Sequence, residues 1–284
     1  MSKQVSALQF SAASVAAIVL LPRLGLVWTA VAVGVCAILY LLVPKRPFSA
    51  PKAVEIALNA WNYIALGGTV DLLSRAFPEG GILIGLLILL VSDYAAGRKT
   101  ALTVGTVASF LLIILYGVLF AFSLPELERP TAGRPDATLL FAALAPLPAV
   151  FLREEEKKGL FGIVGFAVLS LAAALVSNGA DFYTAMKSVR ILGVMERLEP
   201  LVSVAIVISG TCLMTMLCAI NEKTLRRNTK IPLHFFLGCV GLLLSRVLGA
   251  TILAVGTAIF WGVLPILPLS IENPKKFEKN EKNA

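Results

Sequence analysis

Charged, sulfur-containing and histidine residues are scarce in this sequence. Only 15% of its 284 residues are charged, whereas soluble domains carry about 25%. The four cysteines all lie in apolar runs without a CxxC pair and further ligands, and there is a single histidine. These absences exclude a disulfide framework, a zinc site and the histidine–carboxylate sets that activate water. We therefore expect no metal, no cofactor and no enzymatic activity.

Apolar residues, by contrast, make up 58% of the chain, against about 45–50% in soluble domains. Many stretches of about 20 residues contain one ionisable group or none, and that length crosses the hydrocarbon of a bilayer. This composition excludes a soluble enzyme, a disordered regulator and a nucleic-acid-binding domain, although the formal net charge is +8. We expect an integral membrane protein whose surroundings are membrane lipid.

Ten apolar segments are separated by prolines, glycines or charged turns, which predicts an all-α polytopic fold with about ten transmembrane helices. Their approximate ranges are 5–21, 24–43, 53–73, 80–96, 101–123, 138–152, 160–177, 200–220, 231–245 and 249–269. We expect residues 1–269 to form one transmembrane domain and residues 270–284 to form a basic cytoplasmic tail.

The distribution of lysine and arginine predicts the orientation of these segments. If both termini are cytoplasmic, 17 of the 25 basic residues fall on the cytoplasmic side and 8 on the other. Basic residues are enriched in cytoplasmic loops, so this two-to-one bias favours an even number of spans with both termini inside.

A break is predicted in the segment 138–152. It contains Ala145-Pro146-Leu147-Pro148, and a proline inside a helix cannot donate a backbone hydrogen bond. The first segment has the small, polar run Ser11-Ala12-Ala13-Ser14 at the corresponding place. The correspondence is typical of a five-plus-five inverted repeat, with repeats at about 5–123 and 138–269. In the alternative interpretation, the prolines only kink a packed helix.

Polar residues within apolar segments supply the predicted binding site. Asn59, Asn62 and Tyr63 lie in the third segment, and such residues usually face the interior of a helix bundle. We expect a small ligand to bind at Ser11, Ala12, Ser14, Asn59, Asn62, Tyr63, Ala145, Pro146 and Pro148. Three hydroxyls of the eighth segment are candidate ion ligands, although such groups more often bond to their own helix or to a neighbouring one. They are Ser203, Ser209 and Thr211.

Residues 179–199 are too polar to span a membrane and too apolar for a free loop. Phe182, Met186 and Val189 recur at helical spacing, which predicts short amphipathic helices between the seventh and eighth segments. The end of this region reads Val-Arg-Ile-Leu-Gly-Val-Met-Glu-Arg-Leu-Glu over residues 189–199. It resembles the signature of the B-subunit-like permeases of endospore germinant receptors. Gly25-Leu26-Val27-Trp28 and the turns at 94–99 and 124–127 are weaker similarities to that family.

The resemblance implies a LeuT-type fold of the amino acid/polyamine/organocation transporter superfamily. It implies a subunit that binds a small, amino acid-like nutrient and works with A-type and lipoprotein C-type subunits in the spore inner membrane. The motif residues Arg190, Gly193, Glu196, Arg197 and Glu199 are expected to serve structure or gating. The chain is shorter than most members of that family and has Ser-Ala-Ala-Ser where they have a glycine. Two alternatives therefore stay open: a secondary transporter of amino acids or similar solutes, and a membrane scaffold subunit without a ligand.

Overall fold

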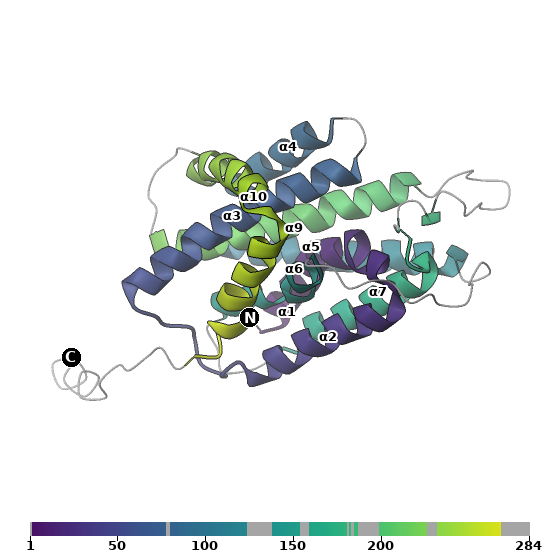
Figure 1. The fold of residues 1–284 in the computed structure, drawn as a ribbon, viewed down its shortest axis with the longest axis horizontal. Coiled ribbons are helices and arrows are strands. Elements are labelled where there is room, and N and C mark those ends of the chain that lie inside the picture. The colour runs from purple at the N-terminus through teal and green to yellow at the C-terminus, as the bar shows by residue number, and fades with distance from the viewer. Residues whose placement is uncertain are drawn as a thin grey trace.

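The structure is a computed structural model that describes residues 2–77, 80–123, 138–153, 159–180, 182, 185–186, 199–225 and 232–267. Helices are the only regular elements in these ranges (Figure 1). The expected all-α class is confirmed for this part of the chain. Arg190, Gly193, Glu196, Arg197 and the tail 270–284 lie outside it, and Glu199 is the first residue of a helix.

A helix lies in each of the ten predicted segments. The first half contains α1 (Ser2–Val19), η1 (Leu21–Leu24), α2 (Gly25–Leu42), α3 (Lys52–Ala76), α4 (Gly81–Tyr94) and α5 (Arg98–Ser123). The second half contains α6 (Thr138–Leu144), η3 (Leu147–Leu152), α7 (Phe161–Ser177), α9 (Glu199–Leu225), α10 (Leu233–Thr257) and η4 (Ala258–Val263).

Four helical stretches of the described residues are long and apolar enough to cross a membrane: Leu21–Leu42, Arg98–Phe122, Pro200–Lys223 and Leu233–Val263. The shorter apolar helices include α4 and α7. Several such stretches, in described residues whose regular elements are all helices, indicate a membrane protein.

Helix α1 lies at the centre of the bundle, where it packs against α5, α7 and α9. Its residues from Val5 to Val19 are all buried. Glycines on the surrounding helices allow this close packing, because a side chain at Gly105 of α5 would collide with Leu8 and one at Gly165 of α7 with Phe10. The predicted first segment is thus the core of the molecule.

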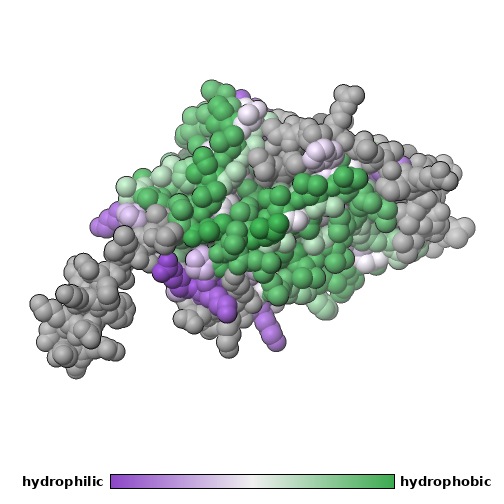
Figure 2. Space-filling view, turned by 60° about the horizontal axis from the view of Figure 1, so that its bottom comes forward, coloured by the Kyte–Doolittle hydropathy of each residue, from purple (hydrophilic) through white to green (hydrophobic). Residues whose placement is uncertain are grey.

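Large apolar side chains on the outer helices face away from the protein. Figure 2 shows hydrophobic residues over the middle of the molecule and most of the visible hydrophilic residues at its lower left. Exposed examples on α2, α4, α5, α7 and α10 include Val31, Ile38, Leu83, Leu87, Phe110, Ile114, Val164, Val168, Val240 and Leu243. A soluble monomer rarely exposes an apolar surface of this extent, whereas lipid is its natural solvent.

Helix α10 contains a turn at Gly249, whose backbone has φ 75° and ψ 167° (Figure 1). His234 at one end contacts Tyr63 of α3, and Trp261 beyond the other end contacts the adjacent Asn62. In a straight helix, residues 234 and 261 would lie about 40 Å apart. The chain therefore folds back at Gly249, at the junction predicted between the last two segments.

Of the predicted amphipathic segment 179–199, the structure describes residues 179–180, 182, 185–186 and 199, and Val189 lies outside the described residues. Phe182 and Met186 are both helical and fully buried, and the ring of Phe182 lies edge-on to Phe120 of α5 at 5.9 Å. The helical spacing predicted for Phe182 and Met186 therefore corresponds to one buried face against the bundle.

Candidate functional site

The predicted break between Ala145 and Pro148 is present. Helix α6 ends at Leu144, and the 3-10 helix η3 begins at Leu147, so Ala145 and Pro146 form the junction. The two prolines cannot donate backbone hydrogen bonds, which prevents the α-helix from continuing. All residues from Ala142 to Leu152 are buried, and both pieces pack against α1. The break therefore lies in the protein interior.

No corresponding break is present in α1, although the predicted five-plus-five repeat implies one at Ser11–Ser14, so this part of the prediction is wrong. Helix α1 runs without interruption from Ser2 to Val19. The Ser11 hydroxyl donates to the Leu8 carbonyl at 3.2 Å, and the Ser14 hydroxyl lies 2.7 Å from the Ser11 carbonyl. Serine hydroxyls satisfied by the preceding turn allow the helix to continue. No glycine or proline interrupts α1.

A buried hydroxyl cluster connects α1 to its neighbours. The Ser14 and Ser209 Oγ atoms are 2.5 Å apart, and the Tyr116 hydroxyl lies 3.2 Å from Ser209 Oγ. The three side chains come from α1, α9 and α5, and all are buried. Tyr116 was not predicted, because a lone tyrosine in an apolar segment gives no signal of its partner.

The three predicted ion ligands do not converge. Ser209 contacts Ser14, whereas the Thr211 hydroxyl donates to the Val207 carbonyl of its own helix at 2.8 Å. Ser209 is six residues from Ser203 and two from Thr211, which places it about 120° and about 160° around α9 from them, so it faces a different side from both. The hydroxyl of Thr211 thus bonds to its own helix, as the alternative interpretation expects. The hydroxyl of Ser209 instead contacts α1 at the centre of the bundle.

A second polar cluster, the amide layer, is formed by Asn62, Asn221 and Trp261. Asn62 Nδ2 donates to Asn221 Oδ1 at 3.0 Å, and Trp261 Nε1 donates to Asn62 Oδ1 at 3.0 Å. All three residues are fully buried, and Asn59 lies one turn away on the same face of α3. Among the described residues, Asn59 Oδ1 and Asn221 Nδ2 have no hydrogen-bond partner. The amide layer thus offers one unused donor, on Asn221, and the neighbouring Asn59 offers one unused acceptor.

Trp261 connects the amide layer to the broken helix. Its ring centroid lies 5.7 Å from that of Phe141 in α6. It belongs to the π-helical turn η4, a type of turn that often marks functional sites. Neither Trp261 nor Asn221 was predicted, because their significance depends on a contact between distant parts of the chain.

Tyr63 faces another direction. Its hydroxyl lies 2.9 Å from His234 Nδ1, and successive residues of a helix diverge by about 100°. The predicted site residues therefore separate into three places: the hydroxyl cluster, the amide layer with the helix break, and Tyr63 against α10. Ala12, Ala145, Pro146 and Pro148 are buried at or beside the first two.

Basic residues surround the end of η3. Arg98 Nη2 donates to the Leu152 carbonyl at 2.7 Å, and Lys223 Nζ donates to the Phe151 carbonyl at 3.0 Å. Arg153 donates to the Pro44 carbonyl, and burial lowers the pKa of its guanidinium. These bonds tie the broken helix to α5, α9 and the loop after α2, on the predicted cytoplasmic side.

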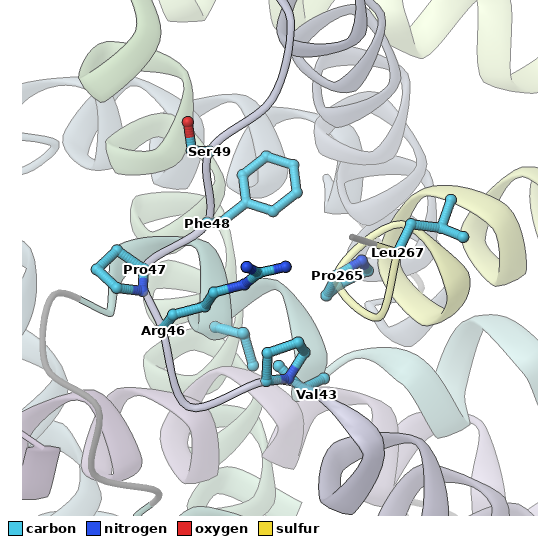
Figure 3. Close-up of a pocket in the computed structure, with 9 residues that line it drawn as sticks. Val43, Arg46, Pro47, Phe48, Ser49, Pro265 and Leu267 are labelled. Carbon is cyan, nitrogen blue, oxygen red and sulfur yellow. The ribbon is translucent and has the colours of Figure 1, made fainter. Parts of the chain in front are cut away.

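A small cavity lies beside this end of the bundle (Figure 3). Its volume is about 20 Å³, and it is lined by Val43, Pro44, Arg46, Pro47, Phe48, Ser49, Val150, Pro265 and Leu267. That volume suits about one water molecule rather than a nutrient. The cavity is separate from the predicted ligand-binding residues.

Comparisons with known proteins give no relative: no family model, no curated protein and no solved structure matches the chain.

Proposed function

We propose that the protein is a ten-span, LeuT-type membrane protein that binds a small polar nutrient between its broken helix and the amide layer. The single observation that carries this proposal is the interrupted helix α6–η3, which is buried in the bundle and packed against α1. Discontinuous helices in transporters expose backbone groups to their substrates. The turn at Gly249 divides α10 into two helical pieces, which supports ten spans.

The polar groups around the break fit an amino acid-like ligand. Helix-break carbonyls and Asn59 Oδ1 accept hydrogen bonds from an ammonium group, and Asn221 Nδ2 donates to a carboxylate. Ser14, Asn62 and Ala145 are buried, so entry of a ligand requires the helices to separate. Binding would then select an open conformation, and no covalent chemistry is needed.

The resemblance at residues 189–199 supports a role as the permease-like subunit of a spore germinant receptor. In this role the protein resides in the spore inner membrane with both termini in the cytoplasm. Its partners are an A-type and a lipoprotein C-type subunit. Co-purification of those two subunits with the tagged protein tests the assembly separately from ligand binding.

The ligand-binding proposal is tested with the full chain in lipid nanodiscs. Thermal unfolding is measured against amino acids, sugars and nucleosides, first for the parent and then for Ala145→Leu. The added volume at the break should abolish the shift that a nutrient produces in the parent. Gly117→Ala is the matched control, because a side chain there meets nothing within 4 Å. An equal shift in Ala145→Leu places the ligand elsewhere.

A scaffold without a ligand is the second candidate, because the central polar groups largely satisfy one another. Ser14 pairs with Ser209, and Asn62 uses both ends of its amide. A parent protein that responds to no nutrient but binds the other subunits supports this candidate. Accumulation of a nutrient in vesicles supports a secondary transporter instead.

A further inference from the structure

The only histidine of the chain occupies a buried position between three helices. His234 lies at the start of α10 and is 0% exposed. Its Nδ1 atom lies 2.9 Å from the Tyr63 hydroxyl of α3, and its Nε2 atom lies 3.6 Å from Glu222 Oε2 of α9. The Glu222 side chain is 34% exposed, so the pair connects the interior to the surface.

Among the residues that the structure describes, few other titratable groups lie near His234. From α4, Asp93 Oδ2 accepts the backbone N–H of Phe235 at 3.2 Å, which places a carboxylate beside the start of α10. On α10 itself the nearest is Cys239. Helices α6 and η4, which also pack against α10, contain no titratable residue. On α9, Lys223 extends to the Phe151 carbonyl.

We propose that His234 and Glu222 form a proton-binding site between α9 and α10. A neutral imidazole accepts a hydrogen bond from the Tyr63 hydroxyl at Nδ1 and directs Nε2–H toward Glu222. When the ring binds a second proton, both nitrogens become donors. Tyr63 then accepts instead of donating, and His234 forms an ion pair with Glu222. The second proton is bound at Nδ1, and the partly exposed Glu222 carboxylate stabilises the resulting positive charge from the Nε2 side.

This site adjoins the amide layer along both helices. Tyr63 directly follows Asn62 in α3, and Glu222 directly follows Asn221 in α9. The hydrogen bond between the two asparagines therefore joins the same two turns that hold the histidine. A change of charge at His234 biases the packing of α3, α9 and α10 around the layer, so proton binding and opening of the layer are coupled. The proposal does not depend on nutrient binding.

The test is an NMR titration of the full chain in nanodiscs with isotope-labelled histidine, after removal of any histidine tag. Because the chain has one histidine, its ring signals need no further assignment. We expect a single titration between pH 5 and 8. In Glu222→Gln the midpoint should move to lower pH by about one unit or more, because a carboxylate within about 4–6 Å stabilises the imidazolium.

Asp71→Asn is the matched control, since it also removes one carboxylate but from a pair with Arg246, 3.0 Å away. Its midpoint should equal that of the parent. Absence of any titration in the parent between pH 4.5 and 9 overturns the proposal, and so does an unchanged midpoint in Glu222→Gln. If Glu222→Gln fails to fold, the parent alone is decisive, because below the midpoint its ring must gain one proton at Nδ1 and then carry protons on both nitrogens. No nutrient is present, so the result is independent of the proposed ligand.

Discussion

Buried hydroxyl groups make two kinds of hydrogen bond, within one helix or between two helices. The presence of a serine or threonine in the sequence does not tell which kind forms. Thr69, Thr211 and Thr257 donate to carbonyls of their own helices, whereas Ser14 and Ser209 bond across helices. The first kind satisfies a polar group within one helix, and the second fixes the position of one helix against another. The interhelical hydroxyls therefore contribute more to the packing of α1.

Ser209→Ala should destabilise the protein by about 1 kcal/mol, because it removes the partner of both Ser14 and Tyr116. Thr211→Val on the same helix is the control and should change stability less, since its hydroxyl bonds only to its own backbone. Denaturant unfolding in mixed micelles measures both free energies. An equal loss in the free energy of unfolding for the two variants would contradict an interhelical role for Ser209.

Asn62→Ala should lower the free energy of unfolding by about 1–3 kcal/mol for each buried group that it leaves without a partner. These groups are Asn221 Oδ1 and Trp261 Nε1. In a background with Trp28→Phe and Trp61→Phe, the emission of Trp261 should shift, because its indole loses a hydrogen bond. Combining Asn62→Ala with Asn221→Ala in a double-mutant cycle isolates the contact between the two asparagines. A zero coupling energy would show that the amide layer does not stabilise the bundle.

Helix breaks follow from backbone chemistry only where a residue removes a hydrogen bond. Pro146 and Pro148 do so, and the break is found there; Ser11 and Ser14 do not, and α1 continues through them. The positions of the helical segments were predictable from apolar runs and their separators. The amide layer was predictable only in part, because Asn62 lies in an apolar helix but its partners lie far along the chain.

Helices α3 and α10 cross at two glycines that the sequence alone does not single out. A side chain on Gly241 would lie 1.9 Å from the Tyr63 carbonyl oxygen, and one on Gly67 would lie 2.0 Å from the Leu242 nitrogen. Both obstacles are backbone atoms, which cannot rotate away. The crossing holds α10 close enough for His234 to reach Tyr63.

Gly241→Ala should therefore destabilise the protein by about 1–3 kcal/mol, as overpacking does in a close-packed core. Gly34→Ala and Gly117→Ala, with nothing within 4 Å, should be neutral or stabilising by up to about 1 kcal/mol, because alanine favours a helix. Thermal unfolding of the three variants measures the contrast. Similar melting temperatures would mean that the two helices do not cross as closely as described.

The bonds from Arg98 and Lys223 to η3 should keep this end of the broken helix, predicted to be cytoplasmic, closed. Arg98→Gln with Lys223→Gln should then increase the rate at which a cysteine introduced at Ala149, which is 0% exposed, reacts with a maleimide. Lys99→Gln is the control, since this neighbouring lysine is exposed. A rate unchanged by the double substitution would exclude these side chains from closing the site.

Over the whole molecule, the distribution of apolar surface and the distribution of charge are consistent with one membrane orientation. Most of the exposed large apolar side chains lie on α2, α4, α5, α7 and α10, while α1 and the broken helix are enclosed by other helices. The basic residues Arg98, Arg153 and Lys223 gather at one end of the bundle, where they bond to η3 or to the loop after α2. Basic groups at one end of apolar helices are typical of the cytoplasmic side.

The orientation is tested by two cysteines in a background from which Cys36, Cys212, Cys218 and Cys239 have been removed. Lys99→Cys lies at the start of α5, and Ala180→Cys lies just beyond the end of α7; both positions are exposed. If both termini are cytoplasmic, the membrane-impermeant maleimide should label Ala180→Cys in intact cells and Lys99→Cys only after lysis. The reason is that α5 begins and α7 ends on opposite sides when each predicted segment crosses once. Labelling of Lys99→Cys from outside would reverse the orientation, and labelling of both would show that the number of crossings between them is even.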